Sequence, residues 1–138
     1  MYFNAHCHLE LSHLRGAIPP GLPFVEWLER VFEEKRTRPV EQAVRAMHAA
    51  IAEMRETGTA AVCDIDRGGL SESVWAESGI EALVFREVID THPQTAEQTL
   101  ADRLRPAPPR SIDIGLSPHA PYSTTPELLR AAAHEAQT

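Results

Sequence analysis

The alternation of short strand-like segments with longer amphipathic segments limits what this chain can fold into. Residues 2–8, 59–65, 81–89 and 112–117 are rich in residues that favour strands. Helical patterns occupy residues 24–32, 40–56, 71–78 and 96–104, and another begins at Pro126. Strands that alternate with helices predict an α/β fold with a parallel sheet and right-handed crossovers.

Chain length narrows the choice of architecture. A complete eight-unit (β/α)8 barrel needs about 250 residues, so 138 residues accommodate four β-α units. An open sheet and half of a barrel both remain possible at this point. No shift in composition divides the chain, and we expect one domain over residues 1–138, with Pro106, Pro108 and Pro109 ending the fourth helical pattern.

Charge and hydropathy exclude several classes of protein. The formal net charge is −7 and no basic run occurs, so we expect no nucleic-acid partner. The apolar stretches are much shorter than the roughly 20 residues that cross a bilayer. His6, His8 and Glu10 interrupt the place where a signal peptide would have its apolar core. Cys7 and Cys63 lie within strands and indicate reduced thiols, so we expect a soluble cytoplasmic protein.

Two histidines on the first strand form the clearest local motif. Side chains alternate between the faces of a strand, so His6 and His8 share one face and Cys7 takes the other. Two imidazoles placed in this way can chelate one divalent metal ion. The alternative is a pair of solvated histidines on an edge strand, since short motifs often occur by chance.

A second motif follows the fourth strand. Pro118 and Pro121 hold His119 and Tyr122 in a rigid loop at the carboxyl end of that strand. In α/β folds this is the end at which ligands bind. The alternative is that the prolines only terminate the strand and leave His119 on the surface.

Acidic residues near the strand ends have both a functional and a structural interpretation. Glu87 can project into the barrel as a substrate-binding residue, or it can pair with the neighbouring Arg86. Asp64 and Asp66 share one strand face and can line the site, or they can cap the loop that follows.

Four segments in order resemble the amidohydrolase superfamily, and together they span nearly the whole chain. The resemblance is closest to the branch of chlorohydrolases, adenosine-type deaminases and aminodeoxyfutalosine deaminases. It implies the N-terminal half of a (β/α)8 barrel, with strands one to four and their helices. The segments are His6–Glu10, Leu14–Gly16, Pro23–Leu28 and Ser117–Ser123.

The resemblance also implies roles for particular residues. His6 and His8 match ligands of one catalytic divalent metal, zinc or iron, which activates water. His119 matches a histidine that faces the substrate, whereas Arg15 and Trp27 match positions where we expect packing. The resemblance implies a carboxylated lysine on strand four in binuclear members, but the only lysine here is Lys35, in a helical segment, so we expect a mononuclear site.

The chain also departs from the family pattern. The family takes a third metal histidine and a proton-shuttling glutamate from strand five, and an aspartate from strand eight. The sequence stops at Thr138, before strand five would begin, and we expect His134 and Glu135 to lie on a solvated helix surface. No catalytic residue is assigned, and whether this chain alone is an enzyme stays open, because catalytic zinc sites usually have three protein ligands.

The leading function implied by the resemblance is hydrolytic deamination of a small molecule, an aminopurine nucleoside such as aminodeoxyfutalosine or a related amine heterocycle. Chlorohydrolase or guanidine-type hydrolysis would use a similar first half. The alternative is a non-catalytic half-barrel from a truncated or split gene, and a third possibility is an open-sheet metal-binding protein. A half-barrel exposes two sheet edges and its inner surface, so we expect a homo-oligomer or association with a missing C-terminal half.

Overall fold

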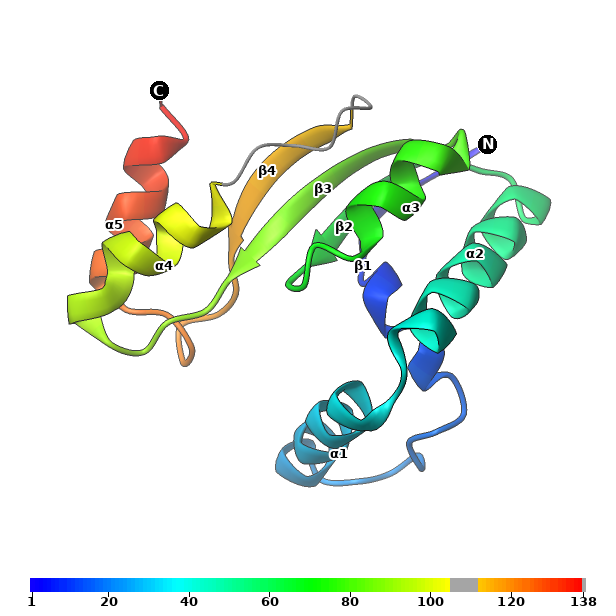
Figure 1. Cartoon of the computed structure of the whole chain (residues 1–138), viewed down its shortest axis with the longest axis horizontal. Helices are drawn as coiled ribbons and strands as arrows, with labels where there is room; N and C mark the ends of the chain where they lie inside the picture. Colours follow the sequence, from blue (N-terminus) through cyan, green and yellow to red (C-terminus); the bar gives the residue numbers. More distant parts are fainter. Residues whose placement is uncertain (105–111, 138) are drawn as a thin grey trace.

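A single parallel sheet organises the chain, of which the computed structural model describes residues 1–104 and 112–137. Its strands pair in the sequential order β1-β2-β3-β4. Sequential order without reversal is the arrangement of a barrel, whereas doubly wound open sheets reverse direction at a switch point. The expectation of about half of a (β/α)8 barrel is therefore confirmed (Figure 1). The strands are β1 (Tyr2–Cys7), β2 (Thr59–Asp66), β3 (Glu81–Val88) and β4 (Asp113–Pro118).

The helices follow the sequence pattern closely. Two of the predicted ranges match the structure at both ends, residues 40–56 and residues 71–78. The first helix extends beyond the expected residue 32, and the segment after β1 forms a 3-10 helix that the pattern did not predict. The expected role of the three prolines at 106, 108 and 109 lies outside the described residues. The helical elements are η1 (Leu9–Leu14), α1 (Phe24–Thr37), α2 (Val40–Glu56), α3 (Ser71–Ser78), η2 (Pro93–Thr95), α4 (Ala96–Arg103) and α5 (Pro126–Glu135).

Local hydrogen bonds and backbone geometry explain where α2 ends and where α5 begins. Gly58 follows α2 with a φ of 83°, and its N–H donates to the carbonyl oxygen of Arg55 at 3.0 Å. A left-handed glycine after the last turn is a common helix terminator. At the start of α5, the hydroxyl of Thr125 accepts from the N–H of Leu128 at 3.2 Å, and Pro126 occupies the first turn. The sequence therefore predicted both the C-terminus of α2 and the N-terminus of α5.

The sheet has two unlike faces, which we name the outer and inner faces. Helices α2 to α5 pack on the outer face, where Val62, Val84 and Val88 are buried by the helices. On the inner face, Ile65 and Phe85 are only half-buried. Helix α1 stands away from the sheet beyond η1 (Figure 1). The hydrophobic core thus lies between the sheet and the helices, and the inner face stays accessible.

Within residues 1–104 and 112–137, no helix is both long enough and apolar enough to span a membrane.

Candidate metal and substrate site

The two histidines of the first motif lie on the inner face at the carboxyl end of β1. The side chain of Cys7, between them in the sequence, points to the outer face, where its Sγ lies 3.5 Å from Oδ1 of Asp64. The rings of His6 and His8 meet edge to face, with their centroids 5.1 Å apart. The strand ends at Cys7, one residue earlier than expected, so His8 begins the turn into η1.

The chemistry of this pair fits part of a metal site. Among the described residues, neither imidazole has a hydrogen-bond partner, so the ring nitrogens are available to a ligand. Neutral imidazole nitrogen binds zinc and related divalent ions. In the same part of the chain, no group of three or more histidine, cysteine, aspartate or glutamate side chains could hold a metal. His6 and His8 can therefore supply two ligands of a larger set.

Asp64 fixes the end of β1 from the outer face. Its Oδ1 accepts from the N–H of Leu9 at 2.7 Å, and its Oδ2 accepts from Nε1 of Trp75 at 2.7 Å. Burial, followed by the charge of Asp64, raises the pKa of the Cys7 thiol well above its ordinary value. The thiol is therefore held protonated next to the metal motif, and it points away from it.

Asp66 caps the loop that leads into α3. One carboxylate oxygen accepts from the N–H of Gly69 at 2.8 Å, and the other accepts from the N–H and the hydroxyl of Ser71. Both aspartates on β2 are fully buried on the outer face, away from the histidine pair. Of the two interpretations of Asp64 and Asp66, the structure supports the one in which they hold the loops.

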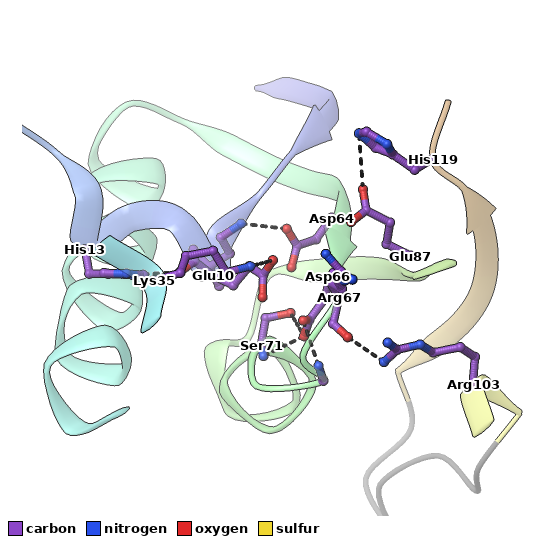
Figure 2. A network of polar contacts seen from close by, with 12 residues as sticks. Glu10, His13, Lys35, Asp64, Asp66, Arg67, Ser71, Glu87, Arg103 and His119 are labelled. Carbon is purple, nitrogen blue, oxygen red and sulfur yellow. Dashed lines mark hydrogen bonds and ion pairs between the residues drawn. The ribbon is translucent and has the colours of Figure 1, made fainter. Parts of the chain in front are cut away.

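Glu87 and His119 come together at the carboxyl ends of β3 and β4 (Figure 2). Oε1 of Glu87 lies 3.9 Å from Nε2 of His119, and the Glu87 side chain is only 10% exposed. Of the two interpretations of Glu87, the one in which it pairs with the neighbouring Arg86 is wrong. Adjacent strand residues face opposite sides, and Arg86 pairs on the outer face with Glu72 at 2.8 Å.

The loop that carries His119 is tied to β3 through its backbone. The N–H of His119 donates to the carbonyl oxygen of Val88 at 3.1 Å, and the N–H of Asp90 donates to the carbonyl oxygen of Ser123 at 3.0 Å. The ring of Tyr122 meets the His119 ring edge to face, at 5.6 Å between centroids. These contacts place His119 in a defined position, with its side chain 33% exposed.

Sequence reasoning missed Asp90 and assigned no role to Ser123, although both support this loop. The carboxylate of Asp90 accepts from the hydroxyls of Thr95 and Thr99 and from the N–H of His92. These hydrogen bonds, that of Thr95 first, lower the pKa of Asp90. An aspartate directly after a strand, followed by two threonines on the next helical segment, was the available signal.

Within the described part of the chain, other residues that the sequence analysis named take no part in the contacts of His6, His8 or His119. Lys35 on α1 donates to Oε1 of Glu10 at 2.7 Å, on the opposite side of Figure 2 from His119. Arg15 forms an exposed ion pair with Glu53 at 2.7 Å. Trp27 stacks on Phe24 with 41% of its surface exposed, so this tryptophan is not part of the core. His134 is exposed on α5, as the sequence predicted, whereas Glu135 is half-buried.

Comparisons with known proteins agree with this geometry. The family model described as the amidohydrolase family matches residues 2–138. A 5-methylthioadenosine/S-adenosylhomocysteine deaminase from Archaeoglobus fulgidus is 31% identical over 140 residues, which cover 95% of this chain and 33% of that protein. An aminodeoxyfutalosine deaminase from Deinococcus radiodurans is 25% identical, with 92% of this chain and 31% of that protein covered. The chain thus spans about a third of the length of these curated relatives.

Solved structures support the fold. The Helicobacter pylori aminofutalosine deaminase in complex with methylthio-coformycin superposes with a TM-score of 0.78 at 23% identity, covering 98% of this chain and 34% of that one. The zinc complex of atrazine chlorohydrolase from Arthrobacter aurescens gives a TM-score of 0.72 at 19% identity, with 98% and 38% covered.

Proposed function

This chain belongs to the amidohydrolase family, and on that premise we propose that it supplies the first half of a metal-dependent deaminase site. The proposed substrate is a small aminopurine nucleoside, with aminodeoxyfutalosine and methylthioadenosine-like compounds as the first candidates. Relatives with both substrate types in their names support this choice. The observation that carries the proposal is the inner-face pair of imidazoles, 5.1 Å apart between centroids.

In the proposed site, each residue has one task. His6 and His8 would hold a divalent ion, zinc or iron. When bound, such an ion acts as a Lewis acid that activates water near neutral pH. His119 and Glu87 would bind the polar edge of the substrate, since both lie at the carboxyl ends of parallel strands, where ligands of this fold bind.

The rest of the ligand set would come from a complementary part of the barrel. Two imidazoles are fewer than the three protein ligands of most catalytic zinc sites, and the described residues hold no larger cluster. We therefore propose that the chain acts with a second half of the barrel or as a homo-oligomer. The free thiols of Cys7 and Cys63 are compatible with the proposed cytoplasmic location.

Metal binding tests the proposal directly. Purified chain is loaded with Zn²⁺ or Fe²⁺ under reducing conditions, and bound metal is quantified for the wild type, His6→Ala, His8→Ala and His48→Ala. His48 is an exposed histidine on α2 and serves as the matched control. We expect weak binding in the wild type and in His48→Ala, and a loss of at least tenfold in affinity in the other two variants. Unchanged metal content in His6→Ala contradicts the assignment.

A second candidate is a non-catalytic half-barrel, which is favoured by the half-buried inner face and the incomplete ligand set. Ammonia release from a panel of aminopurine nucleosides tests the non-catalytic candidate. Turnover by the metal-loaded chain contradicts the non-catalytic candidate and indicates a complete site, formed for example in an oligomer. Bound metal without turnover is the result expected of a half-site that needs a complementary part of the barrel, and loss of that metal in His6→Ala then tests the metal assignment.

A further inference from the structure

The hydroxyl of Ser123 lies between Nδ1 of His119 and the carbonyl oxygen of Ala120. Its Oγ is 2.6 Å from Nδ1 of His119 and 3.1 Å from the carbonyl oxygen of Ala120. A serine hydroxyl has a single proton to donate. The direction of that proton decides which nitrogen of the His119 ring carries its own proton, so the contact sets the tautomer of the ring.

The carbonyl oxygen of Ala120 is already well supplied with donors. It accepts from the N–H of Ser123 at 3.0 Å and from the hydroxyl of Thr124 at 2.8 Å. A carbonyl oxygen has two lone pairs, and these two contacts occupy them. The Ser123 hydroxyl would be the third and most distant donor there, whereas its contact with Nδ1 is shorter by half an ångström.

Glu87 favours the same proton arrangement for an independent reason. If Nδ1 accepts from Ser123, the neutral ring carries its proton on Nε2, which lies 3.9 Å from Oε1 of Glu87. The opposite tautomer would direct the lone pair of Nε2 toward a carboxylate. Two acceptors that face each other in a partly buried place repel, because the local dielectric is lower than that of water.

We propose that Ser123 is a positioning residue that keeps Nδ1 of His119 as an acceptor and so presents Nε2–H beside the carboxylate of Glu87. The site then offers one donor and one acceptor 3.9 Å apart. A ligand edge with an acceptor beside a donor is complementary to it, and the amidine-like edge of an aminopurine is of this kind. That last step rests on the proposed function, whereas the tautomer does not.

Nitrogen NMR of the histidine rings reads the tautomer directly. The wild-type chain is recorded at a pH where the titration of the same nitrogens shows a neutral ring. We expect Nδ1 of His119 to have the shift of a bare ring nitrogen, and Nε2 that of a protonated one. An Nδ1 shift typical of a protonated nitrogen in the neutral wild type would overturn the proposal.

Two variants isolate the hydroxyl of Ser123. Ser123→Ala removes the donor to Nδ1, so the Nδ1 and Nε2 shifts should move toward the average of two tautomers. Thr125→Val is the matched control, because the Thr125 hydroxyl belongs to the same loop and accepts from the N–H of Leu128 at 3.2 Å instead of competing for the Ala120 carbonyl. Ser123→Thr keeps a hydroxyl and should retain the wild-type tautomer. Equal shifts in Ser123→Ala and Thr125→Val would show a structural effect only and would contradict the positioning role.

The two proposals can fail separately. A neutral His119 with its proton on Nε2, in a chain whose His6→Ala variant still binds metal normally, supports the role of Ser123 and contradicts the proposed metal site. A neutral His119 with its proton on Nδ1, in a chain whose His6→Ala variant loses the metal, supports the metal site and contradicts the role of Ser123.

Discussion

Polar side chains on the two faces of the sheet differ in how fully their hydrogen-bonding capacity is used. On the outer face, Asp64 and Asp66 are completely buried, and each accepts from three donors. On the inner face, the imidazoles of His6 and His8 contact each other and have no hydrogen-bond partner among the described residues, and Glu87 lies 3.9 Å from His119. Buried acids that accept from several donors hold the fold, whereas polar groups with few partners can bind a ligand.

The sharpest test of this difference is a pair of isosteric, charge-removing substitutions. Asp64→Asn replaces an acceptor oxygen with an NH₂ group that meets the N–H of Leu9 or of Trp75. A buried donor that loses its partner costs about 1–3 kcal/mol. We expect the free energy of unfolding to fall by about 2–3 kcal/mol in Asp64→Asn, but by less than about 1 kcal/mol in Glu87→Gln.

Urea denaturation of the two variants and the wild type measures both changes. If Glu87→Gln lowers the free energy of unfolding as much as Asp64→Asn does, Glu87 is a structural residue and the difference between the two faces does not hold.

Packing on the inner face gives the next largest effect. A Cβ added at Gly115 would lie 2.7 Å from the ring of Phe85 on the neighbouring strand. The ring is half-buried and can move, so we expect Gly115→Ala to reduce the free energy of unfolding by about 1 kcal/mol. Combining it with Phe85→Leu in a double-mutant cycle should remove most of that cost. Additive losses would mean that the two residues do not contact each other.

Acid sensitivity at Asp90 is the smallest expected effect. Its lowered pKa means that the folded state binds this proton less readily than the unfolded state. The stabilisation is present above the unfolded pKa of about 4 and is lost as the pH falls through the lower folded pKa. Thr95→Val removes a donor to this carboxylate, so its melting temperature should depend less on pH between about 2 and 5.

Thr57→Val is the control for this experiment, because its hydroxyl donates only to backbone carbonyl oxygens at the end of α2. If Thr95→Val and the wild type show the same acid dependence while the control is unchanged, Asp90 does not contribute to it.

The sequence predicted those parts of the fold that depend on local patterns. Helix α2 begins after Pro39 and is followed by Gly58, and its apolar spacing lies within one continuous segment, so both ends could be read directly. The alternation of side chains along β1 likewise predicted that His6 and His8 face one side and Cys7 the other.

Contacts between distant segments could not be read in this way. Arg86 has an acid next to it in the sequence, yet it pairs with Glu72 because strand geometry turns adjacent side chains to opposite faces. The sequence did not predict the hydrogen-bond partners of Asp64, because Leu9 and Trp75 belong to other elements. The hydroxyl of Ser123 acquires its role only when the loop after β4 closes beside β3.

The sequential order of the strands also bears on how the chain reaches its fold. Each strand pairs with the one that precedes it in the sequence, so every strand after β1 joins an edge made by residues that come earlier in the chain. This order avoids the still longer loops that a reordered sheet would have to close. On a ribosome, the sheet can therefore grow one strand at a time, and each new strand adds to an edge that has already formed.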